Sequence, residues 1–289
     1  MKPSAFEYIR AETAEHACAL LVEHGEEARL LAGGQSLIPM MNLRLARPAI
    51  LIDIGRLPLN GIAINARSIR VGALTRHHAL IEDPALRHAA AIFAEAARYI
   101  AHPTIRRHGT AGGSVAHADP TAEIPGLLML LDGHVDAASQ GGVRQIPARE
   151  LFRGAFSTSL KPGEMITALH FQLPAGTWGS CFIELAEREG DFALAAVGAV
   201  IERSGERVTA ARILLMGAES VPVRAGAVEA SLVGRPITEA VAANAGATAA
   251  AAQRCYADIR ATAEYRRHLL AEFTRRALLS AYARAGAAA

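Results

Sequence analysis

The residues most able to do chemistry lie in two glycine-rich stretches, at positions 31–41 and 109–120. Each stretch holds a pair of adjacent glycines, Gly33-Gly34 in the first and Gly112-Gly113 in the second, and a serine follows closely. Because glycine has no Cβ, the backbone N–H groups of such turns can approach an anion closely. Two such turns in one chain predict a single elongated, phosphate-bearing ligand that is held from two sides.

The order of elements around the first glycine pair fits a pyrophosphate group. A short apolar strand at 27–31 leads into Gly33-Gly34, and Ser36 can cap a short helix at 37–43. Backbone N–H donors and a helix N-terminus together stabilise the negative charge of a pyrophosphate, so no lysine is needed. The sequence contains neither Gly-x-Gly-x-x-Gly nor Gly-x-x-x-x-Gly-Lys, so the common nicotinamide and ATP motifs are unsupported. A tight turn without any ligand is the alternative for either pair taken alone.

Composition describes a globular protein and excludes several kinds of partner and cofactor. The 289 residues are 51% hydrophobic and 20% charged, which is enough for two domains with sizeable cores. A formal net charge of +2 gives no broad positive field, so we expect no nucleic-acid partner. Three cysteines, Cys18, Cys181 and Cys255, lie far apart, so the chain cannot bind an iron–sulfur cluster or a structural zinc alone.

The sequence predicts a cytoplasmic protein without a membrane span. The first ten residues include Glu7 and lack an apolar core, unlike a secretory signal. The longest apolar run, at 192–201, covers about half of the length needed to cross a membrane. Cysteines without close partners fit a reducing compartment.

The hydrophobic periodicity predicts an α+β fold, because strands dominate before helices in the C-terminal part. The segment at 174–179, rich in proline and glycine, is the best candidate for a linker between domains. We expect helices at 13–23, 37–43, 85–99, 121–131, 225–233, 240–255 and 263–283. We expect strands at 27–31, 49–54, 62–64, 68–72, within 133–147, and at 165–173, 181–185, 193–202 and 208–216.

At the two glycine turns the chain resembles the medium, flavin-binding subunits of the molybdenum hydroxylases, the family that includes carbon monoxide dehydrogenase and xanthine dehydrogenase. The first stretch resembles that family's Ala-Gly-Gly-(His/Gln)-Ser-Leu turn. The second resembles its Thr-Ile-Gly-Gly-(Ser/Asn) turn and the following Ala-His-Ala-Asp-Pro. A later stretch, Arg188–Ala193, matches as well, and the resemblance covers nearly the whole chain.

This resemblance implies a particular domain organisation. Residues 1–176 would form a two-lobed FAD-binding domain of the vanillyl-alcohol-oxidase-like (PCMH) type, with lobes at about 1–58 and 59–176. Residues 177–289 would form a C-terminal α+β domain with a small antiparallel sheet and helices.

The resemblance also implies roles for individual residues. The segment at 32–37 would wrap the pyrophosphate and the neighbouring ribityl chain, and the segment at 110–114 would hold the pyrophosphate from the other side and approach the isoalloxazine. Glu123 lies where relatives carry an acid that binds the adenosine ribose. Asp119 is the alternative residue for that role, or else it caps the helix that begins near position 121. The cofactor-binding residues predicted in this way are Ala32, Gly33, Gly34, Gln35, Ser36, Leu37, His102, Thr110, Ala111, Gly112, Gly113, Ser114, Asp119, Glu123 and Arg188. No catalytic residue and no metal ligand is predicted in this chain.

Several positions near the expected flavin either depart from the family pattern or have an open role. Ala111 replaces an isoleucine that is common in the family, and Glu184 or Ala186 falls where many relatives carry a flavin-contacting lysine. A cation near the ring raises the reduction potential of a flavin, so either Arg188 supplies that charge or nothing does. His102 precedes the second turn and would line the flavin edge, although it, His108 and His117 also fit chance loop histidines.

The resemblance implies an FAD subunit of a heteromeric molybdenum hydroxylase. A large partner subunit would carry the molybdopterin cofactor, and a small partner would carry two [2Fe–2S] clusters, in an expected dimer of heterotrimers. Electrons would pass from the clusters to FAD in this chain and then to an external acceptor. Two alternatives stay open: a self-standing FAD oxidoreductase of the vanillyl-alcohol-oxidase-like class, and a flavin-free binding or assembly protein.

Overall fold

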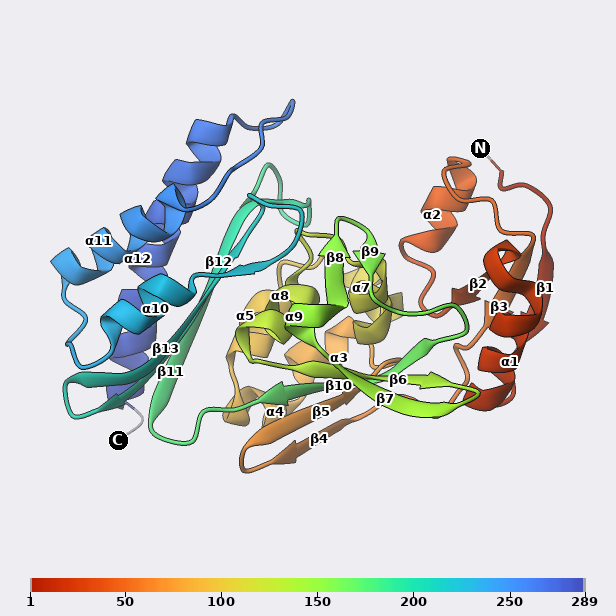
Figure 1. The fold of residues 1–289 in the computed structure, drawn as a ribbon, viewed down its shortest axis with the longest axis horizontal. Coiled ribbons are helices and arrows are strands. Elements are labelled where there is room, and N and C mark those ends of the chain that lie inside the picture. Colours follow the sequence, from red (N-terminus) through yellow and green to blue (C-terminus); the bar gives the residue numbers. More distant parts are fainter. Residues whose placement is uncertain (1, 288–289) are drawn as a thin grey trace.

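The computed structural model describes residues 2–287. Three larger β-sheets follow one another along the long axis of the molecule, and each is accompanied by its own helices (Figure 1). The chain starts at the three-stranded sheet, passes through the five-stranded sheet and ends on the helices beside the four-stranded sheet. The expected α+β class is confirmed.

The N-terminal sheet has three parallel strands in the order β1-β3-β2. The helix α1 begins after Thr13, whose hydroxyl accepts a hydrogen bond from the His16 N–H at 3.0 Å, and its apolar side packs on the sheet. The elements of this part are β1 (Glu7–Arg10), α1 (Ala14–His24), the 3-10 turn η1 (Gly25–Glu27), β2 (Ala28–Leu31), α2 (Leu37–Asn42) and β3 (Ile50–Asp53).

The central sheet is antiparallel, in the order β4-β5-β10-β6-β7. Helices cover one of its faces, and Phe93 of α5 meets Phe171 of β10 edge to face, with ring centroids 4.8 Å apart. The elements of this part are β4 (Ile62–Asn65), β5 (Ser68–Gly72), α3 (His77–Glu82), α4 (Pro84–Ala89), α5 (Ile92–Ala97), α6 (Pro103–His108), α7 (Ala111–His117), α8 (Glu123–Leu130), β6 (His134–Ser139), β7 (Gly142–Pro147), α9 (Ala148–Leu151), β8 (Phe152–Gly154), β9 (Ser157–Thr158) and β10 (Met165–Gln172).

The C-terminal sheet is antiparallel, in the order β11-β12-β13-β14. The first nine residues of β12 are all buried, because α10 and α12 lie on one face of the sheet and α5 and α8 on the other. A strand buried on both faces is apolar throughout, as this one is. The elements of this part are β11 (Trp178–Ala186), β12 (Ala193–Ser204), β13 (Arg207–Met216), β14 (Val223–Arg224), α10 (Gly226–Leu232), α11 (Glu239–Ala251) and α12 (Ala263–Ala287).

The structure corrects several sequence-based expectations. The helix expected at 85–99 is two helices, α4 and α5, because the backbone at Ala90 leaves the helical region (φ −157°, ψ 81°). The helix expected to reach 255 ends at Ala251. Ser36 makes no side-chain capping bond to α2, because its own backbone is already helical (φ −102°, ψ −49°). The elements that were not expected from the sequence are β1, α6, α7, α9, β14 and the β8–β9 pair.

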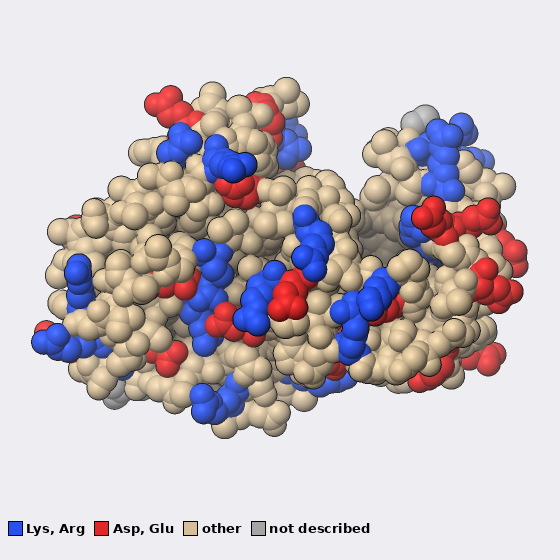
Figure 2. All heavy atoms as spheres, in the orientation of Figure 1, with Lys and Arg blue, Asp and Glu red and all other residues tan. Residues whose placement is uncertain are grey.

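No helix within residues 2–287 is both long enough and apolar enough to cross a membrane. Basic and acidic side chains intermix over the face shown in Figure 2. The same view shows a deep cleft between the part of the molecule that carries α2 and the middle of the molecule, where α7 lies.

Candidate functional site

The first glycine turn connects β2 to α2 and leaves its backbone donors free. Gly34 has a φ of +71°, a conformation that glycine adopts without strain, and the Gln35 side-chain amide donates to the Gly33 carbonyl at 2.9 Å. Within residues 2–287, the N–H groups of Gly33, Gly34, Gln35 and Ser36 have no protein acceptor. Four free donors in one short turn can bind an anion.

The second glycine pair is not a loop but the first turn of α7. Thr110 caps this helix, and its hydroxyl accepts a hydrogen bond from the Gly113 N–H at 3.2 Å. The Ala111 N–H donates to the Thr75 carbonyl, and the Gly112 N–H donates to the Ala73 carbonyl, at 2.9 and 2.8 Å.

The two turns therefore differ in what they can offer a ligand. The backbone donors of the second turn are already used inside the protein, so the expectation that both turns supply free N–H groups is wrong for this one. Gly112 instead permits close packing, because a Cβ at this position would lie 2.5 Å from the Cβ of Ala73. This segment can therefore contribute to ligand binding only through its shape and through the half-buried Ser114 side chain.

The glycine stretches, far apart in the sequence, are in direct backbone contact. A Cβ at Gly33 would lie 2.2 Å from the carbonyl oxygen of His108 and 3.0 Å from the Cα of Gly109. Only a glycine allows this approach, so the first turn is seated against the residues that lead into the second. The fold thus brings the two predicted ligand-binding segments together.

The third motif stretch joins the same neighbourhood from the C-terminal part of the chain. Gly190, in the turn between β11 and β12, has a φ of +85°, and a Cβ there would lie 2.9 Å from the Nδ1 atom of His102. His102 is the N-cap residue of α6, which leads to the second turn. Arg188, in the same turn as Gly190, is exposed.

Two buried glutamates lie where the central and C-terminal parts meet. Glu123 begins α8 and Glu184 lies on β11, and each is only 8% exposed. Burial raises the pKa of Glu123 to about 8, and it raises the pKa of Glu184 to about 10, with the charge of Glu123 as a second cause. Within residues 2–287, the Oε2 atom of Glu184 has no hydrogen-bond partner. Burial therefore favours the protonated form of both carboxyl groups.

Asp119 has a different role from these glutamates. One of its carboxylate oxygens accepts hydrogen bonds from both the N–H and the hydroxyl of Thr121, at 2.8 and 2.7 Å. This arrangement holds the turn that leads into α8. Asp119 is nevertheless not the helix cap that was the alternative, because the N-cap residue of α8 is Ala122 and no side chain caps this helix.

Comparison with known proteins decides the family. Residues 4–174 match the family described as "FAD binding domain in molybdopterin dehydrogenase", and residues 180–281 match the "CO dehydrogenase flavoprotein C-terminal domain". The chain belongs to this flavoprotein family of the molybdopterin dehydrogenases.

Curated relatives and solved structures of this family match along their whole length. The 6-hydroxypseudooxynicotine dehydrogenase complex subunit alpha of Paenarthrobacter nicotinovorans is 38% identical, over 99% of this chain and 97% of the relative. A carbon monoxide dehydrogenase structure from Hydrogenophaga pseudoflava superposes with a TM-score of 0.95 at 36% identity, covering 98% of this chain and 99% of that one. Quinoline 2-oxidoreductase from Pseudomonas putida 86 superposes with a TM-score of 0.94 at 34% identity, covering 99% of both chains.

The residues present fit FAD, the cofactor of this flavoprotein family. The free N–H groups of the first turn suit a pyrophosphate, and the close contact at Gly33 brings the two predicted ligand-binding segments side by side. Neither Glu184 nor Ala186, the two candidates for the position of the lysine in many relatives, adds a positive charge here. The cation that the sequence analysis named for this role, Arg188, is exposed.

The raised pKa values predict how stability changes with pH. A folded state that holds its carboxyl protons more tightly than the unfolded chain loses stability as pH rises above the ordinary glutamate pKa of 4.5. The loss is at most about 1.4 kcal/mol per pH unit for each carboxyl, until the folded-state pKa is reached. Glu184→Gln removes one such group, so we expect the melting temperature of this variant to exceed that of the wild type by more at pH 9 than at pH 6. The exposed Glu187→Gln is the control, and an equal gap at both pH values would contradict the prediction.

The three histidines around the second turn were expected on a loop. In the structure they lie at the ends of helices instead. His108 ends α6, and His117 ends α7 and contacts the ring of Phe156 at 5.0 Å between centroids. Within the described part of the chain, the one converging group of metal-type ligands is elsewhere, on β6 and β10. Its members are polar residues on strands that the sequence predicted. Their closeness could not be predicted from the sequence, because it depends on how β6 and β10 pair.

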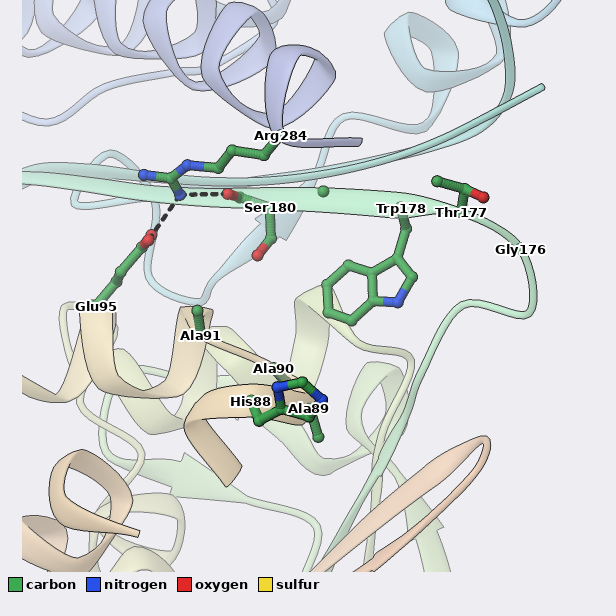
Figure 3. A pocket seen from close by; sticks show the side chains of 11 residues that line it. His88, Ala89, Ala90, Ala91, Glu95, Gly176, Thr177, Trp178, Ser180 and Arg284 are labelled. Carbon is green, nitrogen blue, oxygen red and sulfur yellow. Dashed lines mark hydrogen bonds and ion pairs between the residues drawn. The ribbon is translucent and has the colours of Figure 1, made fainter. Parts of the chain in front are cut away.

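A cavity of about 500 Å³ lies apart from the predicted cofactor residues (Figure 3). It is lined by residues of α4 and α5, by the segment at 176–180 and by Arg284 of α12. Arg284 donates to a Glu95 carboxylate oxygen at 2.6 Å, and the other oxygen of Glu95 accepts from the Phe182 N–H at 3.1 Å. These contacts tie α5 to the C-terminal sheet and helix, so this cavity marks a junction between the two parts of the chain.

Proposed function

We propose that this chain is the FAD-carrying medium subunit of a heteromeric molybdenum hydroxylase. The observation that carries the proposal is the convergence of the three motif stretches, with the Gly33 turn in backbone contact with His108 and the Gly190 turn against His102. We also propose residues 1–176, with lobes at about 1–58 and 59–176, as the FAD-binding domain, and residues 177–289 as the second domain.

The residues of the site divide the work of holding the cofactor. The free N–H groups at 33–36 bind the pyrophosphate, and α7 fixes the opposite wall through its bonds to Ala73 and Thr75. Burial raises the pKa of Glu123 and so favours its protonated form, which can hydrogen-bond the cofactor without repelling its phosphates. When bound, FAD supplies the redox chemistry, and the protein supplies its position and surroundings.

The source of electrons must lie outside this chain. Its three cysteines are free and buried, and they lie in α1, in β11 and in the segment between α11 and α12, so they cannot hold a cluster together. We propose a small partner with two [2Fe–2S] clusters, a large partner with the molybdopterin cofactor, a dimer of heterotrimers in the cytoplasm, and an external electron acceptor. The relatives that are a medium chain or a complex subunit support this assembly.

One experiment separates this function from its two alternatives. Acid precipitation of the purified chain should release yellow FAD, because no covalent link to the protein is predicted. Anaerobic aldehydes, purines, N-heterocycles and carbon monoxide should leave the flavin absorbance of the isolated chain unchanged, and one of them should bleach it once the large and small subunits are added.

Each failure of this experiment has a distinct meaning. A colourless chain that takes up no FAD would point to a flavin-free assembly protein. Bleaching of the isolated chain by one of these compounds would point to a self-standing oxidoreductase.

A further inference from the structure

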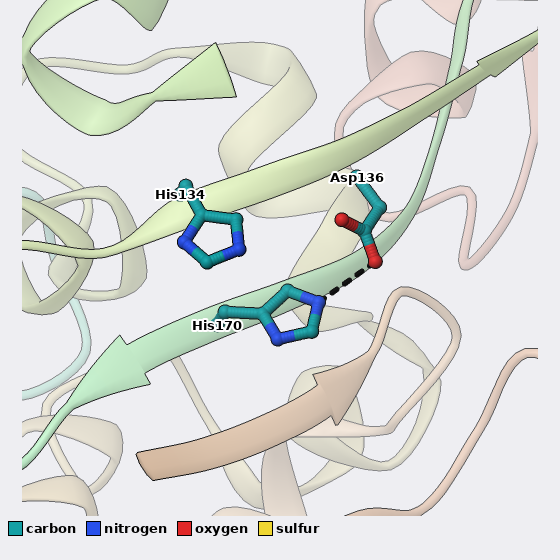
Figure 4. Close-up of side chains that lie close together, drawn as sticks. All are labelled: His134, Asp136 and His170. Atoms are coloured by element: carbon teal, nitrogen blue, oxygen red, sulfur yellow. Dashed lines mark hydrogen bonds and ion pairs between the residues drawn. The ribbon is translucent and has the colours of Figure 1, made fainter. Parts of the chain in front are cut away.

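Three side chains with metal-binding atoms meet on the central sheet, away from the cofactor residues (Figure 4). His134 and Asp136 lie on β6, and His170 lies on the neighbouring strand β10, directly opposite His134 in the antiparallel register. The residues that alternate with them, such as Val135 and Leu169, belong to the core under α5 and α8. The three side chains therefore share the sheet face that is turned away from these helices.

The geometry of this cluster is close to that of a metal site. One ligand atom from each residue lies within 4.8 Å of the other two. The Nε2 atom of His170 lies 2.7 Å from a carboxylate oxygen of Asp136. The two imidazole rings are parallel, with centroids 4.5 Å apart. Within residues 2–287, the buried Nε2 atom of His134 has no hydrogen-bond partner, an arrangement that is rare unless a ligand satisfies the atom.

We propose that His134, Asp136 and His170 bind one divalent transition-metal ion, with Zn²⁺ as the reference ion. Two imidazoles and one carboxylate are a donor set that suits zinc and its neighbours better than calcium or magnesium. Three protein ligands leave the fourth tetrahedral position to water. This proposal rests on the sheet face alone and is independent of the flavin function.

Binding requires small movements that the site allows. With metal–ligand bonds of about 2.0–2.1 Å, two ligands of a tetrahedral zinc lie about 3.3 Å apart, so the His170–Asp136 hydrogen bond must open slightly. The two parallel rings must also turn so that their lone pairs converge. The side chains of His170 and Asp136 are 21% and 19% exposed, which leaves room for these rotations and a path for the ion. On binding, the proton between the His170 Nε2 atom and Asp136 leaves this position, and the Nδ1 atom of His170 or the solvent takes it up.

The neighbours of the cluster affect its affinity in opposite ways. Gln145 on β7 donates to the second Asp136 oxygen at 3.4 Å, a supporting bond that leaves the first oxygen for the ion. Arg70 on β5 lies opposite His170 in the register and is exposed, so its positive charge opposes a cation. Arg70→Gln should therefore tighten binding, by up to about fivefold for a solvent-screened charge.

Isothermal titration of the chelator-treated full chain with Zn²⁺ at pH 7.5 tests the proposal. We expect one saturable equivalent of zinc. His134→Asn and His170→Asn should each weaken its binding at least about tenfold, since even supporting residues of metal sites contribute that much. The control is His268→Asn, an exposed histidine on α12, which should leave the affinity unchanged.

The wild-type titration is decisive even if a variant folds poorly. Absence of a saturable equivalent in the wild type would overturn the proposal, and so would equal affinity in folded His134→Asn and His170→Asn proteins. Circular dichroism of each variant establishes that it is folded. A higher zinc affinity of the Arg70→Gln variant would support the location of the ion on this face of the sheet.

Discussion

Gly34→Val is expected to weaken FAD binding roughly 10- to 100-fold, because hydrogen bonds to a charged group contribute about 1.5–3 kcal/mol. Gly34 has a φ of +71°, and a Cβ there would lie 3.2 Å from Ile38 and 3.3 Å from Leu31 side-chain atoms. A β-branched residue cannot hold this conformation without strain, so the turn must change. The free N–H groups of Gln35 and Ser36 then no longer converge on the pyrophosphate. Titration of the flavin-free protein with FAD, followed by flavin fluorescence, measures the loss.

A second glycine provides the matched control for this substitution. Gly234 has a φ of +82° and open space where its Cβ would be, so Gly234→Val introduces the same backbone strain far from the predicted site. This variant should lose some stability and keep its FAD affinity. If both variants bound FAD like the wild type, the first turn would be a structural feature only. Gly34→Ala should give a smaller loss in the same direction.

The sequence predicted the strands better than the helices of this fold. Short, continuously apolar segments such as 193–202 and 208–216 are typical of buried strands, and they form β12 and β13 in the structure. The alanine-rich run at 85–99 has helical propensity throughout, yet tertiary packing breaks it at Ala90. Local propensity could not show this, because the break falls at an alanine, without a proline or glycine to mark it.

The predicted site was limited by what sequence can say about hydrogen bonds. Both glycine pairs looked alike, since each is followed by a serine. Only the fold shows that the donors of Ala111 and Gly112 are taken by Thr75 and Ala73, while those of the first turn are free. In the same way, nothing local marks Glu184 as a protonated acid, because its pKa depends on burial and on Glu123, which is remote in the sequence.

Arg266→Ala is expected to cost about 3–5 kcal/mol of stability in the C-terminal part of the chain. The Arg266 side chain is fully buried, and one of its nitrogens donates to the carbonyls of Leu194 and Gly217, at 2.6 and 3.0 Å. Another nitrogen donates to Asp258 at 2.7 Å, and the guanidinium lies over the Tyr256 ring at 4.4 Å. The truncation leaves two carbonyls without donors, releases the segment between α11 and α12, and opens a cavity.

The lone tryptophan makes this loss measurable where it occurs. Trp178 lies on β11, beside β12, so its fluorescence during urea unfolding reports the C-terminal sheet. Arg207→Ala is the matched control, because this exposed arginine also donates to a backbone carbonyl, that of Gly234, at 2.8 Å. Its removal should change stability by no more than about 0.5 kcal/mol, as for most surface positions. Arg266→Lys should fall in between, since a lysine keeps the charge but not the planar fork that reaches three acceptors. Equal urea midpoints for Arg266→Ala and Arg207→Ala would show that water or repacking replaces the buried guanidinium at little cost.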